Sequence, residues 1–596
     1  MIEVLFEKKS AGFKTFLFLL FIVTFYSFSQ ENVINAKVEV DKFGNLFVNN
    51  TISNLDKQKD TIIVHSRILL HKDQASLIGS IKLGKVVYKQ YLPRANDFSF
   101  SVNLLKEKTD SYRMTKDFFL ASISYLGTLK QDFGKKRKFN IEAKLPEKFP
   151  LIYPNIEDLE RAYLYPPPII AGDFYNTTIN GFDVYNLNAL KKSKEKVKDI
   201  IEVINDAYRF YLQTYPERNS KPKIIFVPFI SKTLLGKTLD NVILLNSKML
   251  KDTARLEIRL LAHEVAHLFW GVSGLRFKES VLTEGIAEYM SLKYLDFKKE
   301  KKELKSLLNK KGYRSEGFRE ASLVSKKIKS EDRSVISYSF STLLFLYNEK
   351  ENNNLYTVLS QFYKEKSSSN TTISLNELQE FLEGKELPLI ASNVLPDFFI
   401  TETENNLIIN GFTINNTKVE VVKALTNGTE EKHSLSFTYK NDTYTFPKTN
   451  LEKITIDPDY KVLQFSRLND VWHKNETSYS SKNRYFNIED VNPKVLTISD
   501  QLLSYLETKD NLILNDLTCE ANVWLADSYK KLKDEIYKDV EGDIIITGAS
   551  TYYNKGSKSM TIKMVYYTKS SNTSQLVYLR LYLDETLHYV QKLKKY

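Results

Sequence analysis

The run RLLAHEVAHLFWG constrains the fold most, because it places two histidines and a glutamate inside an otherwise apolar segment. His263, Glu264 and His267 follow the pattern H-E-x-x-H, and on a helix this spacing puts both imidazoles on one face. We predict one buried helix from about residue 254 to Trp270, ended by Gly271. Buried imidazoles and a buried carboxylate need partners. A metal ion bound by both histidines provides them, whereas the alternative is a core helix with two incidental histidines.

A third metal ligand is expected downstream, because catalytic zinc takes three protein ligands and leaves a fourth position for water. The segment SVLTEGIAEYMSLKYL predicts a helix with Glu284 near its start, and sixteen residues separate Glu284 from His267. Glu288 lies one turn further on the same face, where it can accept a hydrogen bond from the second ring nitrogen of a ligand histidine. In the alternative interpretation the helix dipole favours the Glu284 carboxylate, and Glu288 belongs to a solvent-exposed face.

The two segments together resemble the gluzincin metallopeptidases, and most of all the M1 aminopeptidase family, in which H-E-x-x-H precedes a helix beginning E-G-x-A-x-Y. The connecting loop here is two residues shorter than in the family, and the family's N-E-G is Thr283-Glu284-Gly285. The resemblance implies a thermolysin-like, mostly helical zinc domain. It also implies that His263, His267 and Glu284 bind one Zn²⁺ per chain, with Glu264 as general base.

The resemblance implies a further catalytic residue, Tyr338, in the run SVISYSFSTLLFLYNE. In the family a tyrosine before a helix donates a hydrogen bond to the tetrahedral oxyanion, and a phenol aimed at developing negative charge is a reasonable electrostatic catalyst. The lysine and glycine of the family's pattern are replaced by Phe340 and Ser341. The chain has 36 tyrosines, so the alternative is that Tyr338 only packs.

The family's G-x-M-E-N motif, whose glutamate binds the free amino group of the substrate, corresponds to the run GKTLDN that begins at Gly236. Asp240 and Asn241 are the residues that would contact the substrate, although Asp is one methylene shorter than Glu. The strand-like run from Val242 to Leu245 follows directly. The alternative is an Asp-Asn turn before that strand.

The chain has 596 residues, which exceeds what one hydrophobic core organises, so the fold class is multidomain α+β. Alternating strand patterns and helical patterns predict the boundaries. Helices are expected at 190–215, over 299–386, and at 499–508 and 521–537. The predicted parts are a signal peptide at 1–29, an N-terminal antiparallel β domain at 30–165, the zinc domain at 166–396, a small β-sandwich at 397–466, and a C-terminal α+β domain at 467–596.

Residues 1–29 combine a basic start (Lys8, Lys9 and Lys14) with an apolar run from Thr15 to Phe28, as a secretory signal does. An uncleaved anchor is the alternative, and no membrane span is expected after cleavage. The single Cys519 cannot form an internal disulfide, which favours a bacterial periplasmic or secreted protein.

The net charge is +12, and the lysines are spread through the chain and mixed with acidic residues. The run from Lys298 to Lys311 is predicted to be a solvated helix surface. We expect no nucleic-acid partner. The sequence predicts an exported zinc metallopeptidase acting on a peptide or protein, most simply an aminopeptidase. An endopeptidase and a non-catalytic peptide-binding scaffold are the alternatives. The oligomeric state is not indicated.

Overall fold

The computed structural model describes residues 34–595 with gaps. The longer gaps are 104–111, 122–127, 131–136, 155–161, 316–334, 385–395, 475–482, 487–492, 510–529, 569–574 and 584–589, and the others have at most five residues. The chain divides into two compact units, Met1–Lys278 with Tyr363–Ser374, and Glu279–Phe362 with Leu375–Tyr596. The predicted signal peptide lies outside the described residues.

The first unit begins with strands that alternate buried and exposed residues, as half-buried strands do. Strand β1 (Ile34–Val40) pairs antiparallel with β2 (Asn45–Ile52) but parallel with β10 (Arg137–Lys144), so the predicted antiparallel region includes a parallel pair. The N-terminal strands form three sheets, in the orders β12-β10-β1-β2-β6, β11-β13-β8-β7 and β4-β5-β3-β9. The other strands are β3 (Ile62–His65), β4 (Ala75–Leu83), β5 (Val86–Pro93), β6 (Asp97–Asn103), β7 (Tyr112–Met114), β8 (Phe118–Ala121), β9 (Thr128–Leu129), β11 (Leu151–Tyr153), β12 (Ala162–Tyr163) and β13 (Ile169–Gly172).

Strand β13 follows the boundary predicted at residue 165, yet it pairs with β8 and β11. The N-terminal strand pairing therefore extends to Gly172. A buried cluster from Ile34 to Ala171 holds these sheets together.

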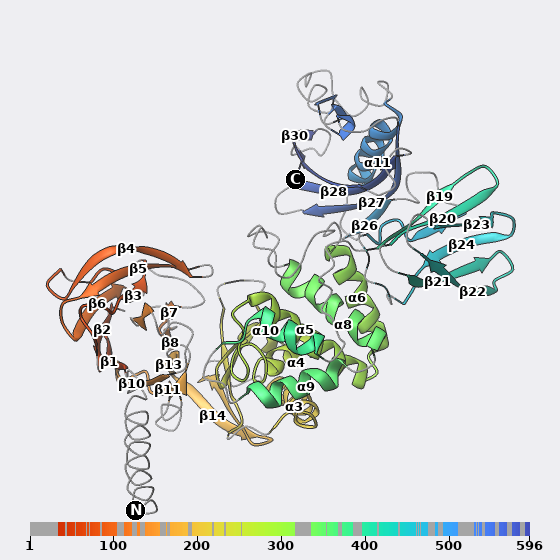
Figure 1. Ribbon diagram of the computed structural model, residues 1–596. Helices are drawn as coiled ribbons and strands as arrows, with labels where there is room; N and C mark the ends of the chain where they lie inside the picture. The colour runs from red at the N-terminus through yellow and green to blue at the C-terminus, as the bar shows by residue number, and fades with distance from the viewer. Residues whose placement is uncertain are drawn as a thin grey trace, which may run out of the picture. The chain divides into compact units, whose positions relative to one another are not determined.

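A mixed five-stranded sheet follows in the first unit, in the order β14-β15-β16-β18-β17. Its first strand, β14, is the long yellow arrow in Figure 1. The inner strands of this sheet are parallel, and the hairpin of β17 and β18 puts β17 at one edge. The crossover helix α3 (Lys194–Leu212) buries Val197, Ile201, Ile204 and Tyr208 on one face, which is helical spacing. The strands are β14 (Phe174–Ile179), β15 (Phe182–Leu187), β16 (Lys223–Val227), β17 (Gly236–Leu239) and β18 (Val242–Asn246), followed by the short helix η4 (Ser247–Leu250) and by α4 (Ile258–Ala266).

The second unit begins with helices, as the pattern over 299–386 predicts. Helix α5 (Ser280–Phe297) packs closely on the start of α8, where a Cβ at Gly285 would lie 2.3 Å from Ser341 Oγ. One segment of the bundle is a π-helix, η5 (Ile336–Phe340), which runs directly into α8. The other helices are α6 (Lys301–Ser315), α8 (Ser341–Asn352) and α10 (Leu375–Glu383), together with α9 (Leu355–Lys366), whose residues from Tyr363 onward are counted with the first unit.

Two sheets, β19-β20-β23 and β22-β21-β24-β25, then share one buried cluster that includes Phe398, Val421 and Ile454. This is a β-sandwich, and its last strand, β25, lies after the boundary predicted at residue 466. A buried Arg467 joins Asp457 (2.6 Å) and Asp470 (3.2 Å). The strands are β19 (Asp397–Glu402), β20 (Asn406–Phe412), β21 (Thr417–Leu425), β22 (Glu430–Phe437), β23 (Asp442–Pro447), β24 (Leu451–Ile456) and β25 (Val471–His473).

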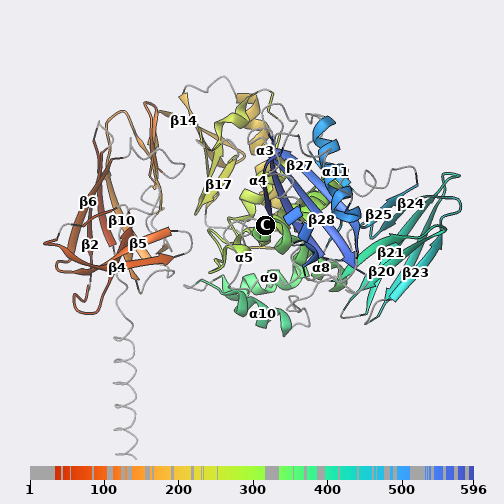
Figure 2. The same ribbon diagram turned by 90° about the horizontal axis from the view of Figure 1, so that it is seen from above.

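The C-terminal part is a five-stranded sheet with helix α11 (Pro493–Thr508) lying against β27 and β28 (Figure 2). Helix α11 begins six residues before the predicted start at 499, and most of the helix predicted at 521–537 lies outside the described residues. Among the described helices, none is both long and apolar enough to cross a membrane. The strands, in sheet order, are β26 (Asn483–Phe486), β27 (Ile544–Asn554), β28 (Ser559–Thr568), β29 (Gln575–Leu583) and β30 (Val590–Lys595). The architecture is multidomain α+β.

Candidate metal centre

Helix α4 carries the H-E-x-x-H residues, but it is shorter than predicted. It ends at Ala266, because the backbone N–H groups of Leu268 and Phe269 bond to carbonyls only three residues back. His267 is the C-cap residue and keeps helical angles, with φ −63° and ψ −19°. The two imidazoles therefore keep the one-turn spacing that the sequence predicts.

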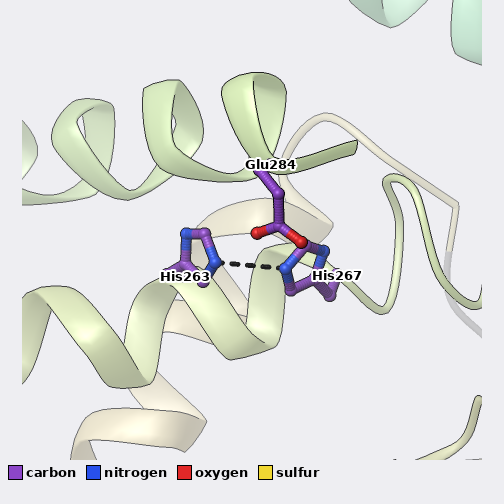
Figure 3. A group of neighbouring side chains, drawn as sticks. All are labelled: His263, His267 and Glu284. Carbon is purple, nitrogen blue, oxygen red and sulfur yellow. Dashed lines mark hydrogen bonds between the residues drawn. The ribbon is translucent and has the colours of Figure 1, made fainter. Parts of the chain in front are cut away.

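His263, His267 and Glu284 lie together (Figure 3), with one ligand atom from each within 4.8 Å of the others. The two Nε2 atoms are 3.1 Å apart. Two nitrogens bound to tetrahedral zinc at 2.0–2.1 Å would be about 3.3 Å apart, which this separation matches closely. Two imidazoles and a carboxylate are also a known ligand set of catalytic zinc. The three residues fit a zinc ion, and they are the residues that the sequence analysis expected as ligands; zinc binding by them stays a prediction.

The ring of His267 is held from its other side. Its Nδ1 lies 3.1 Å from the main-chain carbonyl of Trp270, a contact that fixes the ring and leaves Nε2 for a metal. Trp270 is fully buried and stacks on Phe277 with ring centroids 6.1 Å apart. Aromatic packing after the helix therefore positions an acceptor for His267, whereas the sequence analysis expected Glu288 to serve one of the two ligand histidines in this way.

Glu264, the predicted general base, is 5 % exposed and lies beneath the edge strand β17. Thr238 Oγ1 is 2.8 Å from Glu264 Oε2 and 2.7 Å from the Glu264 main-chain oxygen. A Cβ at Gly236 would lie 2.8 Å from Glu264 Cγ. Sequence reasoning missed Thr238, although Gly236 at the start of the run GKTLDN was a signal of close backbone approach.

Glu288 is 3 % exposed, and its Oε1 accepts a hydrogen bond from Lys311 Nζ at 2.7 Å. Lys311 also donates to the main-chain carbonyl of Tyr338. The prediction that Lys298 to Lys311 is a solvated surface is wrong at Lys311, which is 6 % exposed because the buried carboxylate of Glu288 requires a partner. An interaction of Glu288 with a ligand histidine stays a prediction.

Tyr338 lies in the π-helix η5, between buried residues on both sides, and is itself 39 % exposed. Its main-chain carbonyl accepts from Lys311 and from Thr342 Oγ1 (3.2 Å). Single π turns are frequent at functional sites, because they displace a side chain from the regular helical path. The role of Tyr338 as oxyanion donor stays a prediction.

Asp240 and Asn241 form the two-residue turn between β17 and β18, with φ 52° at Asp240. The Asp240 carboxylate lies 3.5 Å from Arg276 Nη2, and the two side chains are 15 % and 11 % exposed. Tyr153 and Ser273 donate to it at 3.3 and 3.4 Å. Asn241 donates to Ser220 and to the Lys221 carbonyl. The turn matches the alternative interpretation in its backbone, whereas substrate contact by either residue stays a prediction.

No family model and no curated protein matches the chain. Among solved structures, the fold is similar to that of Legionella pneumophila aminopeptidase A in complex with aspartic acid. The TM-score is 0.50 and the identity 12 %, and the match covers 80 % of this chain but only 63 % of that chain. At this identity the likeness shows a shared fold alone.

Proposed function

We propose that the chain is an exported zinc-dependent metallopeptidase. The observation that carries the proposal is the gathering of two imidazoles and one carboxylate, with their ligand atoms within 4.8 Å, around a helix that also carries Glu264. Support comes from the fold shared with an aminopeptidase. The resemblance to the M1 family supports the finer assignment to M1-like gluzincins.

His263, His267 and Glu284 would hold the zinc ion. Zinc in such a site polarises a carbonyl and lowers the pKa of a bound water. Glu264 would accept a proton from the attacking water and deliver it to the nitrogen of the leaving amine, as general base and then general acid. Tyr338 would donate its phenolic hydrogen to the oxygen that becomes negatively charged. The burial of the histidines and Glu264, each 5 % exposed, strengthens these electrostatic interactions.

The aminopeptidase form of this activity is supported by the aminopeptidase that shares the fold and by the family resemblance. A specific observation favours an endopeptidase as the second candidate. The Asp240 carboxylate is engaged by the Arg276 guanidinium, and a neutralised carboxylate attracts a substrate ammonium group less strongly.

A panel of fluorogenic aminoacyl and internally quenched peptide substrates tests the activity, with the chain as purified, after chelation and after zinc is restored. We expect turnover that chelation removes and zinc returns. No turnover of any substrate by the zinc-loaded chain would leave only the non-catalytic binding alternative.

Free-amino and N-acetylated forms of the preferred peptide then separate the two peptidase classes. Hydrolysis of the free-amino form alone supports the aminopeptidase, and equal rates support the endopeptidase.

A further inference from the structure

The edge strand β17 crosses over α4 at Glu264. Thr238 and Gly236 lie two residues apart on this strand, so their side-chain positions share one face. That face meets Glu264, since Thr238 Oγ1 lies 2.8 Å from Oε2 and an added Cβ at Gly236 would lie 3.0 Å from Oε1. The strand therefore contacts Oε2 through Thr238 and passes close to Oε1 at Gly236.

The Thr238 hydroxyl has one proton and two acceptors, both on Glu264. The main-chain carbonyl is an acceptor because α4 tightens at its end, which leaves late carbonyls without helical partners. An ionised carboxylate is the stronger acceptor of the two, because hydrogen bonds to charged groups are roughly twice as strong as neutral ones. The hydroxyl therefore favours Oε2 when Glu264 is ionised.

Gly236 supplies the space for this arrangement. An added Cβ would lie 2.8 Å from Glu264 Cγ and 3.1 Å from Cδ, which real Cβ contacts rarely reach. The Glu264 side chain would have to move, because it is more flexible than the backbone of the paired strand. Glycine at 236 thus permits the rotamer of Glu264 that Thr238 holds.

We propose that Thr238 and Gly236 are positioning residues, which fix the Glu264 carboxylate for proton transfer. Thr238 does so by the hydrogen bond from its hydroxyl, and Gly236 by having no side chain where the Glu264 side chain lies. The inference rests on the proposed function. Proton transfer depends steeply on placement, and a displacement of about 1 Å costs on the order of 100-fold in rate.

Kinetics of the zinc-loaded chain test the catalytic part. Thr238→Val keeps the shape and removes the hydroxyl, and should lower kcat about 10-fold or more with little change in KM, because the base is no longer held in place. Thr238→Ser restores the hydroxyl and should recover most of kcat, and Gly236→Ala should lower kcat independently. The matched control is Thr508→Val, which removes a hydroxyl that donates to the helical carbonyl of Ser504 at 2.8 Å. Wild-type kcat in both Thr238→Val and Gly236→Ala would overturn the inference.

Thermal unfolding of the metal-free chain tests the contact without activity. Thr238→Val should lower the thermal-unfolding midpoint when Glu264 is present. It should lower this midpoint much less in a Glu264→Leu background, because the carboxylate that accepts from Thr238 is already gone. An equal decrease in both backgrounds would show that Thr238 serves only the main-chain carbonyl, and would overturn the inference. The two proposals fail differently: wild-type turnover with unchanged kcat in the variants removes only the positioning role, whereas absence of wild-type turnover removes the peptidase proposal and the positioning role with it.

Discussion

Replacing Lys311 with methionine should destabilise the helical part of the second unit. Methionine has a similar volume, but it leaves Glu288 buried and without its cation. The Lys311 and Glu288 side chains are 7 % and 4 % exposed, and their charged atoms are 2.7 Å apart. Removing one partner of such a buried pair costs about 3–5 kcal/mol, because the remaining charge stays desolvated. The variant also loses the hydrogen bond to the Tyr338 carbonyl, so the cost should lie in the upper part of this range.

A loss of about 4 kcal/mol corresponds to a decrease of roughly 8–16 °C in the thermal-unfolding midpoint of a domain of about 150–250 residues. Differential scanning calorimetry of the metal-free chain measures it, with Lys432→Met as control, since Lys432 pairs with Glu420 at 3.8 Å and is 65 % exposed. The double variant Glu288→Met/Lys311→Met should recover most of the loss, because replacing both partners removes the unpaired charge. A single variant within about 1 kcal/mol of wild type, or a double variant as unstable as the single, would refute the reasoning.

Three further predictions concern packing, charge and metal. Gly285→Ala places a Cβ 2.3 Å from Ser341 Oγ, so overpacking should lower the stability by about 1–3 kcal/mol, and Ser341→Gly should relieve it in the double variant measured by the same calorimetry. Arg467→Met leaves Asp457 and Asp470 buried without their shared cation, and should cost about 3–5 kcal/mol, seen as faster amide hydrogen exchange in β24; unchanged exchange there would contradict it. Zinc at 100 times its dissociation constant should stabilise the wild-type chain by about 2.7 kcal/mol, and the midpoint of His267→Ala should rise far less on zinc addition.

The placement of the two histidines beside each other was predictable because their geometry is local. The spacing of His263 and His267 fixes their relation on any helix, even one that ends at Ala266 instead of Trp270. Glu284 was expected from the helical pattern that follows and from the need for a third ligand, and the family resemblance agreed, but nothing local to the sixteen residues between His267 and Glu284 dictates that it lies beside the histidines.

The supporting contacts were not predictable, because they depend on tertiary pairing. Thr238 meets Glu264 from a strand 26 residues earlier, and Lys311 meets Glu288 from the next helix. Lys311 belongs to a lysine-rich run that indicates an exposed surface by composition alone. The extent of strand pairing past residue 165 likewise depends on which sheet accepts β13.

The central claim is that Glu264 acts as the base beside a zinc ion held by His263, His267 and Glu284. The most direct test compares wild type with Glu264→Gln at equal zinc content, measured by metal analysis of the same samples. We expect one zinc per chain in both proteins. We also expect peptide turnover by wild type that falls by at least about 100-fold in the variant, because general acid–base catalysis contributes that much or more. Turnover by Glu264→Gln at the wild-type rate would contradict the claim.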